Sequence, residues 1–165
     1  MVAFTSKIEF KDYIKLIFKI LYRKTSMRLI TLGGIGTFIY ALINYLGLVQ
    51  PEDPAATRFL FIGIAIVVVM PAFLYYNHRK GFYKRNGLHQ TISFEFDEVS
   101  VKSASEVSSF EENYDPSYIV EEFDNWFVIF REKTALYIIP KEALGNQLPA
   151  FRTLMEDSGM YLKLQ

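Results

Sequence analysis

The chain lacks cysteine and is poor in histidine, two of the side chains that most often build catalytic and metal centres. There is no cysteine among its 165 residues, which excludes disulfides, thiolate metal sites and a cysteine nucleophile. The two histidines, His78 and His89, are eleven residues apart and belong to no zinc-binding spacing. Neither a nucleophilic-serine motif nor the acidic spacing of a calcium loop is present. We therefore expect no catalytic, metal or cofactor site, and a protein that is not an enzyme.

Charge is missing from two long stretches of the sequence. Residues 29–49 and 59–76 contain no Asp, Glu, Lys or Arg. About 20 helical residues cross a hydrocarbon core of roughly 30 Å, and a soluble helix that is apolar on every side is unusual. We predict two transmembrane helices here, joined by a short extracellular turn at 50–58 that contains Pro51 and Pro54. The first run starts too late, and is too long, for a cleavable signal peptide.

Net charge is zero, yet the two signs are unevenly distributed. Twelve Lys or Arg and four Asp or Glu lie up to His89, whereas six and fourteen follow from Gln90 onward. The basic residues concentrate before the first apolar run and in the basic linker at 77–89 after the second. Because positively charged flanks stay in the cytoplasm, we predict a multi-pass hairpin with both termini cytoplasmic. No nucleic-acid-binding motif accompanies the basic half, so the lipid bilayer is its favoured partner.

Residues 1–28 are expected to form a short strand followed by a basic amphipathic helix. Val2–Phe10 alternates in part and is rich in β-branched and aromatic residues, so it is a candidate extra strand for the C-terminal sheet. Residues 10–28 carry cations about every four positions opposite an apolar side, a pattern typical of a helix at an anionic leaflet. Docking of this helix on the acidic C-terminal domain is the alternative. The membrane-surface candidates are Lys7, Lys11, Lys15, Lys19, Arg23 and Lys24.

Small residues in the apolar runs indicate how the helices pack. Gly33, Thr37 and Ala41 recur at a spacing of four, and Gly63 is their counterpart in the second run. Contact within the hairpin is the favoured interpretation, and a homodimer face is the alternative. Asn44 is expected to form an interhelical hydrogen bond, since no intramembrane charge accompanies it.

From residue 90 onward the periodicity of the sequence changes to two. Short alternating runs bounded by turn residues predict antiparallel strands, and Pro149–Asp157 has the pattern of a helix. The predicted strand segments are 91–96, 99–102, 108–110, 118–120, 126–130 and 135–139. We therefore predict an α+β membrane protein, in which residues 90–165 form an antiparallel sheet closed by a C-terminal helix.

A resemblance to the YcxB-like family of small bacterial membrane proteins is carried by the segment HQTISFEFDEVSVKSASEVSSFEE…YIVEEFDNWFVIFREKTALYIIPKEAL. The matched features are a strand pair with an acidic turn, the pair Trp126-Phe127, and the ending Ile138-Ile139-Pro140-Lys141. The resemblance implies a bacterial cytoplasmic membrane, two spans, and a cytoplasmic domain similar to pleckstrin-homology (PH) domains. It implies no established reaction. The chain departs from the family at two places. The family usually has a Trp near the position of Phe110, and it runs directly into the next strand, whereas residues 111–117 form a longer and more acidic segment here.

These features together predict a membrane-anchored binding or regulatory protein that presents a PH-like domain at the cytoplasmic face. The acidity of the domain favours a basic or strand-like protein partner over an anionic lipid, with Trp126 or Phe127 as the contact. Two other functions remain open. One is immunity against a membrane-active peptide, and the other is an accessory subunit of a membrane transporter or enzyme that contacts the membrane helices.

Overall fold

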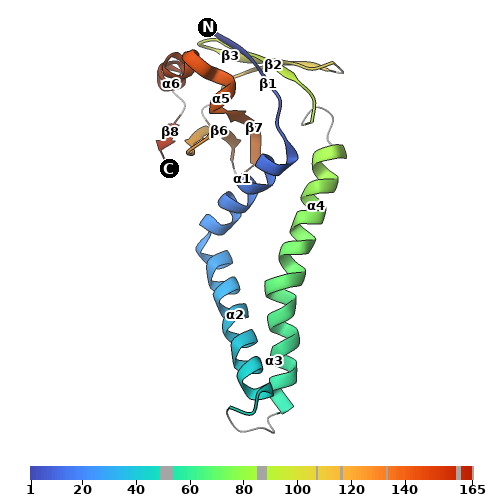
Figure 1. Ribbon diagram of the computed structural model, residues 1–165. Coiled ribbons are helices and arrows are strands. Elements are labelled where there is room, and N and C mark those ends of the chain that lie inside the picture. The colour runs from blue at the N-terminus through green and yellow to red at the C-terminus, as the bar shows by residue number, and fades with distance from the viewer. Residues whose placement is uncertain are drawn as a thin grey trace. The chain divides into compact units, whose positions relative to one another are not determined.

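A computed structural model shows that the chain forms two compact units (Figure 1). One unit, the sheet domain, combines Met1–Ile8 with Arg85–Gln165, and the other, the helical hairpin, is Glu9–Lys84. The residues that the structure describes are 1–48, 54–84, 89–106, 108–115, 117–132, 134–158 and 161–164.

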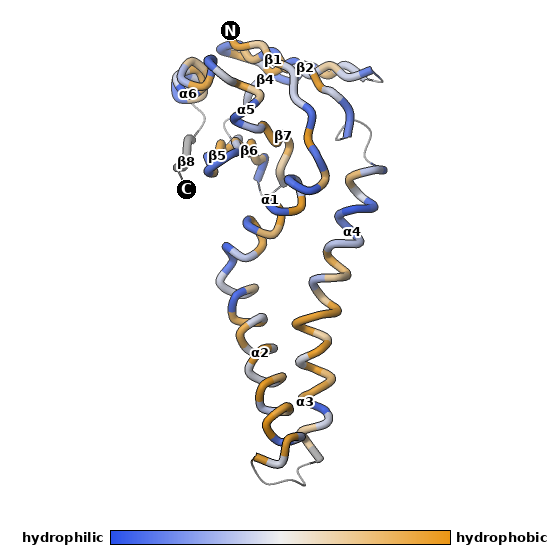
Figure 2. Tube along the Cα trace, viewed as in Figure 1, coloured by the Kyte–Doolittle hydropathy of each residue, from blue (hydrophilic) through white to orange (hydrophobic). Residues whose placement is uncertain are grey.

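The helical hairpin contains two long antiparallel helical segments preceded by a shorter helix. Helix α2 packs against both α3 and η1, and α1 contacts α2 and α4. Apolar residues dominate α2, α3 and η1, whereas α1 and the end of α4 are mixed (Figure 2). The elements are α1 (Phe10–Arg23), α2 (Thr25–Tyr45), α3 (Pro54–Ile64), the π-helical turn η1 (Ala65–Val69) and α4 (Met70–Lys84).

The basic helix ends earlier than its sequence pattern predicts. We expected residues 10–28, but α1 stops at Arg23 because Lys24 adopts an extended conformation with ψ 123°. The amide of Lys24 closes α1 on the Leu21 carbonyl, while its own carbonyl accepts the first hydrogen bonds of α2. Arg28 Nε also donates to the Tyr22 carbonyl at 2.7 Å. One residue therefore caps two helices, and the charge periodicity continues across the break.

The first apolar helix is displaced toward the N-terminus relative to the predicted 29–49. Its end at Tyr45 is explained by Gly47, which has a φ of +69°. The Gly47 amide donates to the Asn44 carbonyl, and the Leu48 amide donates to the Ile43 carbonyl. This is a Schellman cap, which favours glycine at the left-handed position. The remaining predicted residue, Val49, lies outside the described residues.

The second apolar helix is much longer than the predicted 59–76. It is continuous from α3 to the end of α4, so the expected turn at 50–58 is helical from Pro54 and the expected linker at 77–89 is helical through Lys84. The parts at 50–53 and 85–88 lie outside the described residues. The π-helical turn ends at Val69, two positions before Pro71. Proline has no amide hydrogen, so the altered hydrogen bonding lies next to the proline.

The sheet domain is built from two four-stranded sheets. The first has the order β1-β2-β3-β4 and is antiparallel throughout. The second has the order β7-β6-β5-β8, in which β8 runs parallel to β5. The strands are β1 (Val2–Ser6), β2 (Ile92–Phe96), β3 (Ser100–Ala104), β4 (Ser109–Asn113), β5 (Tyr118–Glu122), β6 (Trp126–Arg131), β7 (Thr134–Pro140) and β8 (Tyr161–Leu164).

The N-terminal strand joins the sheet domain across the whole intervening hairpin. Phe4 of β1 faces Phe94 of β2 in antiparallel register, which confirms the expected added strand. Alternation explains this, because Val2, Phe4 and Ser6 are buried while Ala3 and Thr5 are exposed. Strand β1 and helix α1 therefore belong to different compact units although they are neighbours in sequence.

Aromatic side chains from both sheets and a C-terminal helix form the core of the domain. The ring of Phe151 lies 5.1 Å from those of Phe96 and Phe127, and 6.3 Å from that of Phe4. Phe151 belongs to α6 (Leu148–Asp157), which follows α5 (Lys141–Leu144) and the 3-10 turn η2 (Gly145–Gln147). The expected closing helix is therefore present, but a second sheet and strand β8 after the helix were not predicted.

Candidate functional site

The surfaces of the two long helices are apolar and open. Thr25–Tyr45 and Ala55–Lys84 are long and apolar enough to cross a membrane by length and composition, and only 11% and 6% of their most apolar stretches are buried. The core helix of a soluble protein would have most of these side chains covered. Large apolar side chains such as Leu32, Phe61 and Phe73 are more than 60% exposed.

The contact between these helices is made where side chains are smallest. Gly63 lies against the backbone of Phe38, and a Cβ on Gly63 would come within 2.8 Å of the Phe38 Cα. Gly34 lies in the same way against the side chain of Ile66. Ala41 and Asn44 are also buried on α2. The buried residues of α2, Gly34, Ala41 and Asn44, are separated by seven and then three positions, so they lie on one face of the helix and form its contact with the second helix.

Four residues were predicted to form this contact, and the structure gives them different positions. Ala41 is 2% exposed and Gly63 is buried against Phe38. Thr37 is half-buried, and its hydroxyl donates to the Gly34 carbonyl at 2.9 Å. Gly33 is exposed, with no atom near an added Cβ, so Gly34 takes its place within the hairpin. A strict spacing of four turns gradually around a helix, which explains the shift by one residue.

The side chain of Asn44 bonds within its own helix, and not between the helices as its position in the apolar run suggested. Its Nδ2 donates to the carbonyl of Tyr40 at 2.9 Å, within the same helix, although the residue is only 6% exposed. The ring of Tyr40 packs edge-on against that of Phe59 at 5.5 Å. The polar side chain is therefore satisfied by its own helix turn rather than by the hydrogen bond between helices that we expected.

The apolar side of α1 packs on the polar end of α4. Phe82 is 2% exposed and lies 5.4 Å from the ring of Phe10 and 5.1 Å from that of Tyr13. The Tyr13 hydroxyl is also hydrogen-bonded to Nδ1 of His78 at 3.3 Å. The sequence pattern indicated lipid, the acidic domain or, least of all, nucleic acid as the partner of this helix, and α4 was not among the predicted partners. The sequence did contain one indication that α4 packs against α1, because Phe82 is an apolar residue within the otherwise basic segment 77–89.

The predicted membrane-surface cations are exposed. Lys7 follows β1 in the sheet domain, and Lys24 lies at the break between α1 and α2. Lys15 forms an exposed ion pair with Asp12 at 3.1 Å, one turn away. The exposed cations carried by α1 itself are Lys11, Lys15, Lys19 and Arg23. They leave the apolar side of the helix free to pack on α4.

A buried carboxylate joins three elements of the sheet domain. Glu122 on β5 is 5% exposed, is 2.6 Å from Lys141 Nζ, and makes a two-point contact with Arg152 of α6. Burial alone raises the pKa of Glu122, but the hydrogen bonds and charges of Arg152 and Lys141 outweigh it and place the pKa below its ordinary value. Lys141 also lies over the Phe127 ring, 5.3 Å from its centre.

The aromatic pair predicted as a partner contact is mostly internal. Phe127 has no exposed surface, so it is a core residue. Trp126 is half-buried and pairs with Pro140 on β7. Among the residues of the domain whose exposure the structure describes, the exposed aromatic is instead Phe110 on β4, at 58% exposure. An aromatic in an otherwise polar strand was the sequence signal for it, and only its place at a sheet edge distinguishes it from a core residue.

A second carboxylate connects the two sheets on the side of β4. Glu112 accepts hydrogen bonds from Arg131 Nη1 at 3.2 Å and from the Tyr137 hydroxyl at 3.4 Å. Burial, together with this carboxylate, raises the pKa of Tyr137 to about 12. Burial and the nearby Glu112 also raise the pKa of Tyr118. The network is therefore structural at neutral pH, because both phenols remain protonated.

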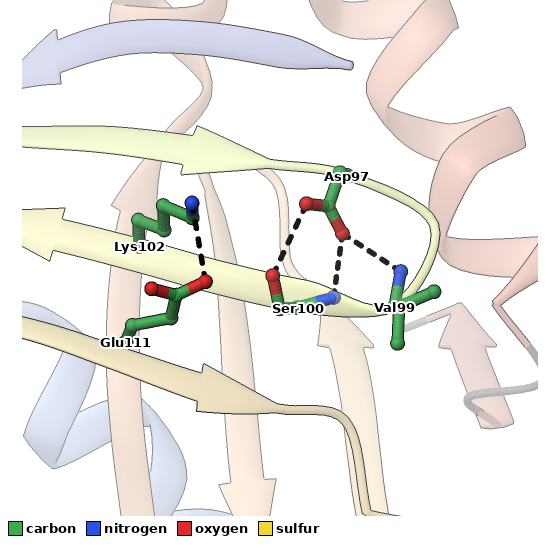
Figure 3. Close-up of polar contacts among 5 residues, drawn as sticks. All are labelled: Asp97, Val99, Ser100, Lys102 and Glu111. Atoms are coloured by element: carbon green, nitrogen blue, oxygen red, sulfur yellow. Dashed lines mark hydrogen bonds and ion pairs between the residues drawn. The ribbon is translucent and has the colours of Figure 1, made fainter.

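The β2–β3 turn is organised by a single aspartate (Figure 3). Asp97 accepts hydrogen bonds from the amides of Val99 and Ser100, at 2.8 and 2.6 Å, and from the Ser100 hydroxyl at 3.1 Å. The hydrogen bonds from the Val99 and Ser100 amides are the main reason that the pKa of Asp97 is lowered. The Tyr114 hydroxyl donates to the Asp97 carbonyl at 2.8 Å, which connects the turn to the end of β4.

The described residues contain no group of His, Asp or Glu side chains that could hold a metal ion. No protein family model, curated protein or solved structure matches the chain. The chain combines an α+β domain of two sheets with a pair of exposed apolar helices. In the sequence, the first strand of the domain precedes these helices and the other strands follow them.

Proposed function

We propose that the protein is a non-enzymatic binding or regulatory protein of the bacterial cytoplasmic membrane, similar to the YcxB-like family. The helical hairpin spans the bilayer and anchors the sheet domain, which binds a protein partner at the cytoplasmic face. The observation that carries the proposal is the insertion of two exposed apolar helices between β1 and β2.

The insertion supports a hairpin whose two ends are on one side of the membrane. Strands β1 and β2 are hydrogen-bonded neighbours, so the chain must leave and re-enter the same folded unit. An even number of crossings meets this condition, and the cations near both ends favour the cytoplasmic side. A helix of 30 residues is about 45 Å long, so the end of α4 extends beyond a core of roughly 30 Å.

The strand order supports a PH-like domain. An antiparallel group of four strands, β1 to β4, is followed by the antiparallel group β5 to β7 and then by helix α6, which packs on both groups through Phe151. Such folds serve as scaffolds for binding sites rather than for one reaction. Their function must therefore be assigned from exposed surfaces.

Membrane topology is testable because the chain has no native cysteine. Thr57→Cys and Glu156→Cys place single thiols on exposed residues of the hairpin and of the sheet domain. We expect a membrane-impermeant maleimide to label the first variant in intact cells and the second only after permeabilisation. Labelling of both in intact cells would overturn the proposed orientation.

Partner binding is testable by site-specific photo-crosslinking of the full-length chain in cells. A photoreactive residue is placed at Glu98 or Trp126 in the sheet domain, or at Phe61 in the hairpin. Capture of the same protein from the two domain positions, and not from Phe61, supports a binding domain. Capture from Phe61 alone would instead support an accessory subunit that contacts the membrane helices.

A further inference from the structure

Strand β4 is an open edge of the first sheet, and it carries two glutamates and an exposed phenylalanine. It is the last strand of its sheet in the described part of the chain, and four of its five side chains are exposed. The opposite edge strand, β1, is contacted by α5 and buries three of its five side chains. An uncovered edge offers unpaired backbone groups to another strand.

The hydrogen-bond pattern shows which backbone groups of β4 point outward. The Tyr114 amide donates to Val99, and the Ser105 amide donates to Ser108, both at 2.8 Å. In an antiparallel pair every second residue pair is hydrogen-bonded. By this alternation Phe110 and Glu112 bond to β3. Three residues therefore direct their amide and carbonyl groups to the open edge, namely Ser109, Glu111 and Asn113.

The side chains of β4 differ between its two faces. Phe110 pairs with Ser103, which pairs with the buried Phe94, so these residues share the inner face of the sheet. Phe110 is nevertheless 58% exposed at the end of this row. Glu111 is on the outer face, where it pairs with Lys102 at 3.1 Å (Figure 3). This ion pair is half-exposed, so it does not prevent a second cation from approaching.

We propose that β4 is the partner-binding edge of the sheet domain and that it binds an extended basic peptide segment by antiparallel strand addition. The proposal rests on the proposed function and specifies its site. An antiparallel neighbour would place consecutive residues opposite Glu112, Glu111 and Phe110. The complementary order, read from N- to C-terminus, is basic, basic, apolar.

Charge selects this occupant over a second copy of the chain. Two β4 strands paired edge to edge would bring Glu111 and Glu112 of each copy close to those of the other, and like charges opposed across strands are destabilising. The same glutamates attract a cationic strand, although each already has one cationic partner within the domain, Lys102 for Glu111 and Arg131 for Glu112. Apolar contact with Phe110 adds affinity and fixes the register, since a shift by one residue would place the apolar side chain on the wrong face.

The probe is a fluorescent nine-residue peptide. Its three central positions are Arg, Lys and Ile, in that order, and threonines flank them. Binding to the full-length protein in lipid nanodiscs is measured by fluorescence anisotropy. N-methylation of the central Lys removes an amide hydrogen that faces β4, and we expect it to abolish binding. N-methylation of the neighbouring Ile removes one that faces away, so this control peptide should still bind.

Three protein variants test the edge from the other side. Phe110→Ala should weaken peptide binding roughly tenfold, because the exposed part of the ring is no longer buried. Ser109→Pro removes an amide hydrogen that points to the open edge and makes no hydrogen bond to β3. This variant should therefore abolish peptide binding while β4 stays paired with β3. Glu98→Gln, in the exposed β2–β3 turn, is the charge control and should bind as the unmodified protein does. Circular dichroism checks that each variant is folded.

The proposal is overturned if both N-methylated peptides bind equally, or if Phe110→Ala and Ser109→Pro bind as well as the unmodified protein. A dimer in nanodiscs or detergent that Ser109→Pro disrupts would also overturn it, in favour of a second copy. If the peptide fails to bind while crosslinks from Glu98 or Trp126 still capture one protein, the inference is wrong and the proposed function stands.

Discussion

Arg152 of α6 holds the buried carboxylate of Glu122 of β5 in a two-point ion pair, with its Nε 3.1 Å from Oε2. Lys141 reaches the same carboxylate from α5. The segment that follows β7 is therefore attached to the second sheet by charge as well as by Phe151.

The Glu122 ion pairs predict a pH-dependent stability. Glu122→Gln should lower the free energy of unfolding by roughly 2–3 kcal/mol at neutral pH, below the range for fully buried pairs because Arg152 is 42% exposed. The folded-state pKa of Glu122 lies below its ordinary 4.5. This stabilisation is therefore complete above pH 4.5 and is lost as the pH falls through the folded-state pKa. Urea unfolding at a series of pH values should show the two proteins converging in acid, whereas exposed Glu106→Gln should match the unmodified protein throughout.

The glycines of the hairpin predict an asymmetric response to added methyl groups. Gly63→Ala should destabilise the hairpin by about 1–3 kcal/mol, because the new Cβ meets the Phe38 backbone, which cannot rotate away. Gly33→Ala meets nothing within 4 Å and should be neutral or stabilising. Unfolding by SDS in mixed micelles measures both. If Gly33→Ala is the damaging variant, the face of α2 that matters contacts another molecule.

Phe82 predicts how firmly α1 is held by α4. Phe82→Ala removes a ring that is 2% exposed and contacts both Phe10 and Tyr13, which should cost about 3–5 kcal/mol of packing. Hydrogen exchange in Phe10–Arg23 should then accelerate. Phe73→Ala is the matched control, since Phe73 is 61% exposed on the same helix. Unchanged exchange in α1 after loss of Phe82 would show that another surface holds this helix.

Asp97 predicts a local effect on the β2–β3 turn. Asp97→Ala removes the acceptor for the Val99 and Ser100 amides, so both should lose protection from hydrogen exchange and the melting temperature should fall. Glu98→Ala, at the adjacent exposed position, should leave both amides protected. Because the pKa of Asp97 is lowered, the turn should also loosen as the pH falls through that pKa. Equal protection of the two amides in both variants would show that backbone hydrogen bonds alone hold the turn, without the Asp97 side chain.

The helical part of the fold could be predicted as far as composition determines it. The absence of charge over 29–49 and 59–76 indicates two apolar helices wherever their exact ends lie. The ends themselves depend on local hydrogen bonding. Gly47 terminates α2 in a left-handed conformation, and Lys24 separates α1 from α2, although its charge continues the periodic pattern.

In the sheet domain, alternation predicted six of the described strands and the strand at the N-terminus. It could not reveal that the strands divide into two sheets, because period two is the same in either sheet. It also predicted a contact role for Phe127, which is buried, and passed over Phe110. Exposure of an aromatic depends on whether a neighbouring element covers it, which the sequence pattern of one strand does not contain.

The sequence by itself determined the apolar helix pair, the alternating strands and the absence of thiol chemistry, because these depend on residue type and local period. Tertiary structure alone decided that β1 pairs with β2, that Gly34 and Gly63 form the helix contact, and that β4 remains an open edge. The physical reason is that pairing and coverage depend on which distant segments meet, and a local pattern is compatible with several such partners.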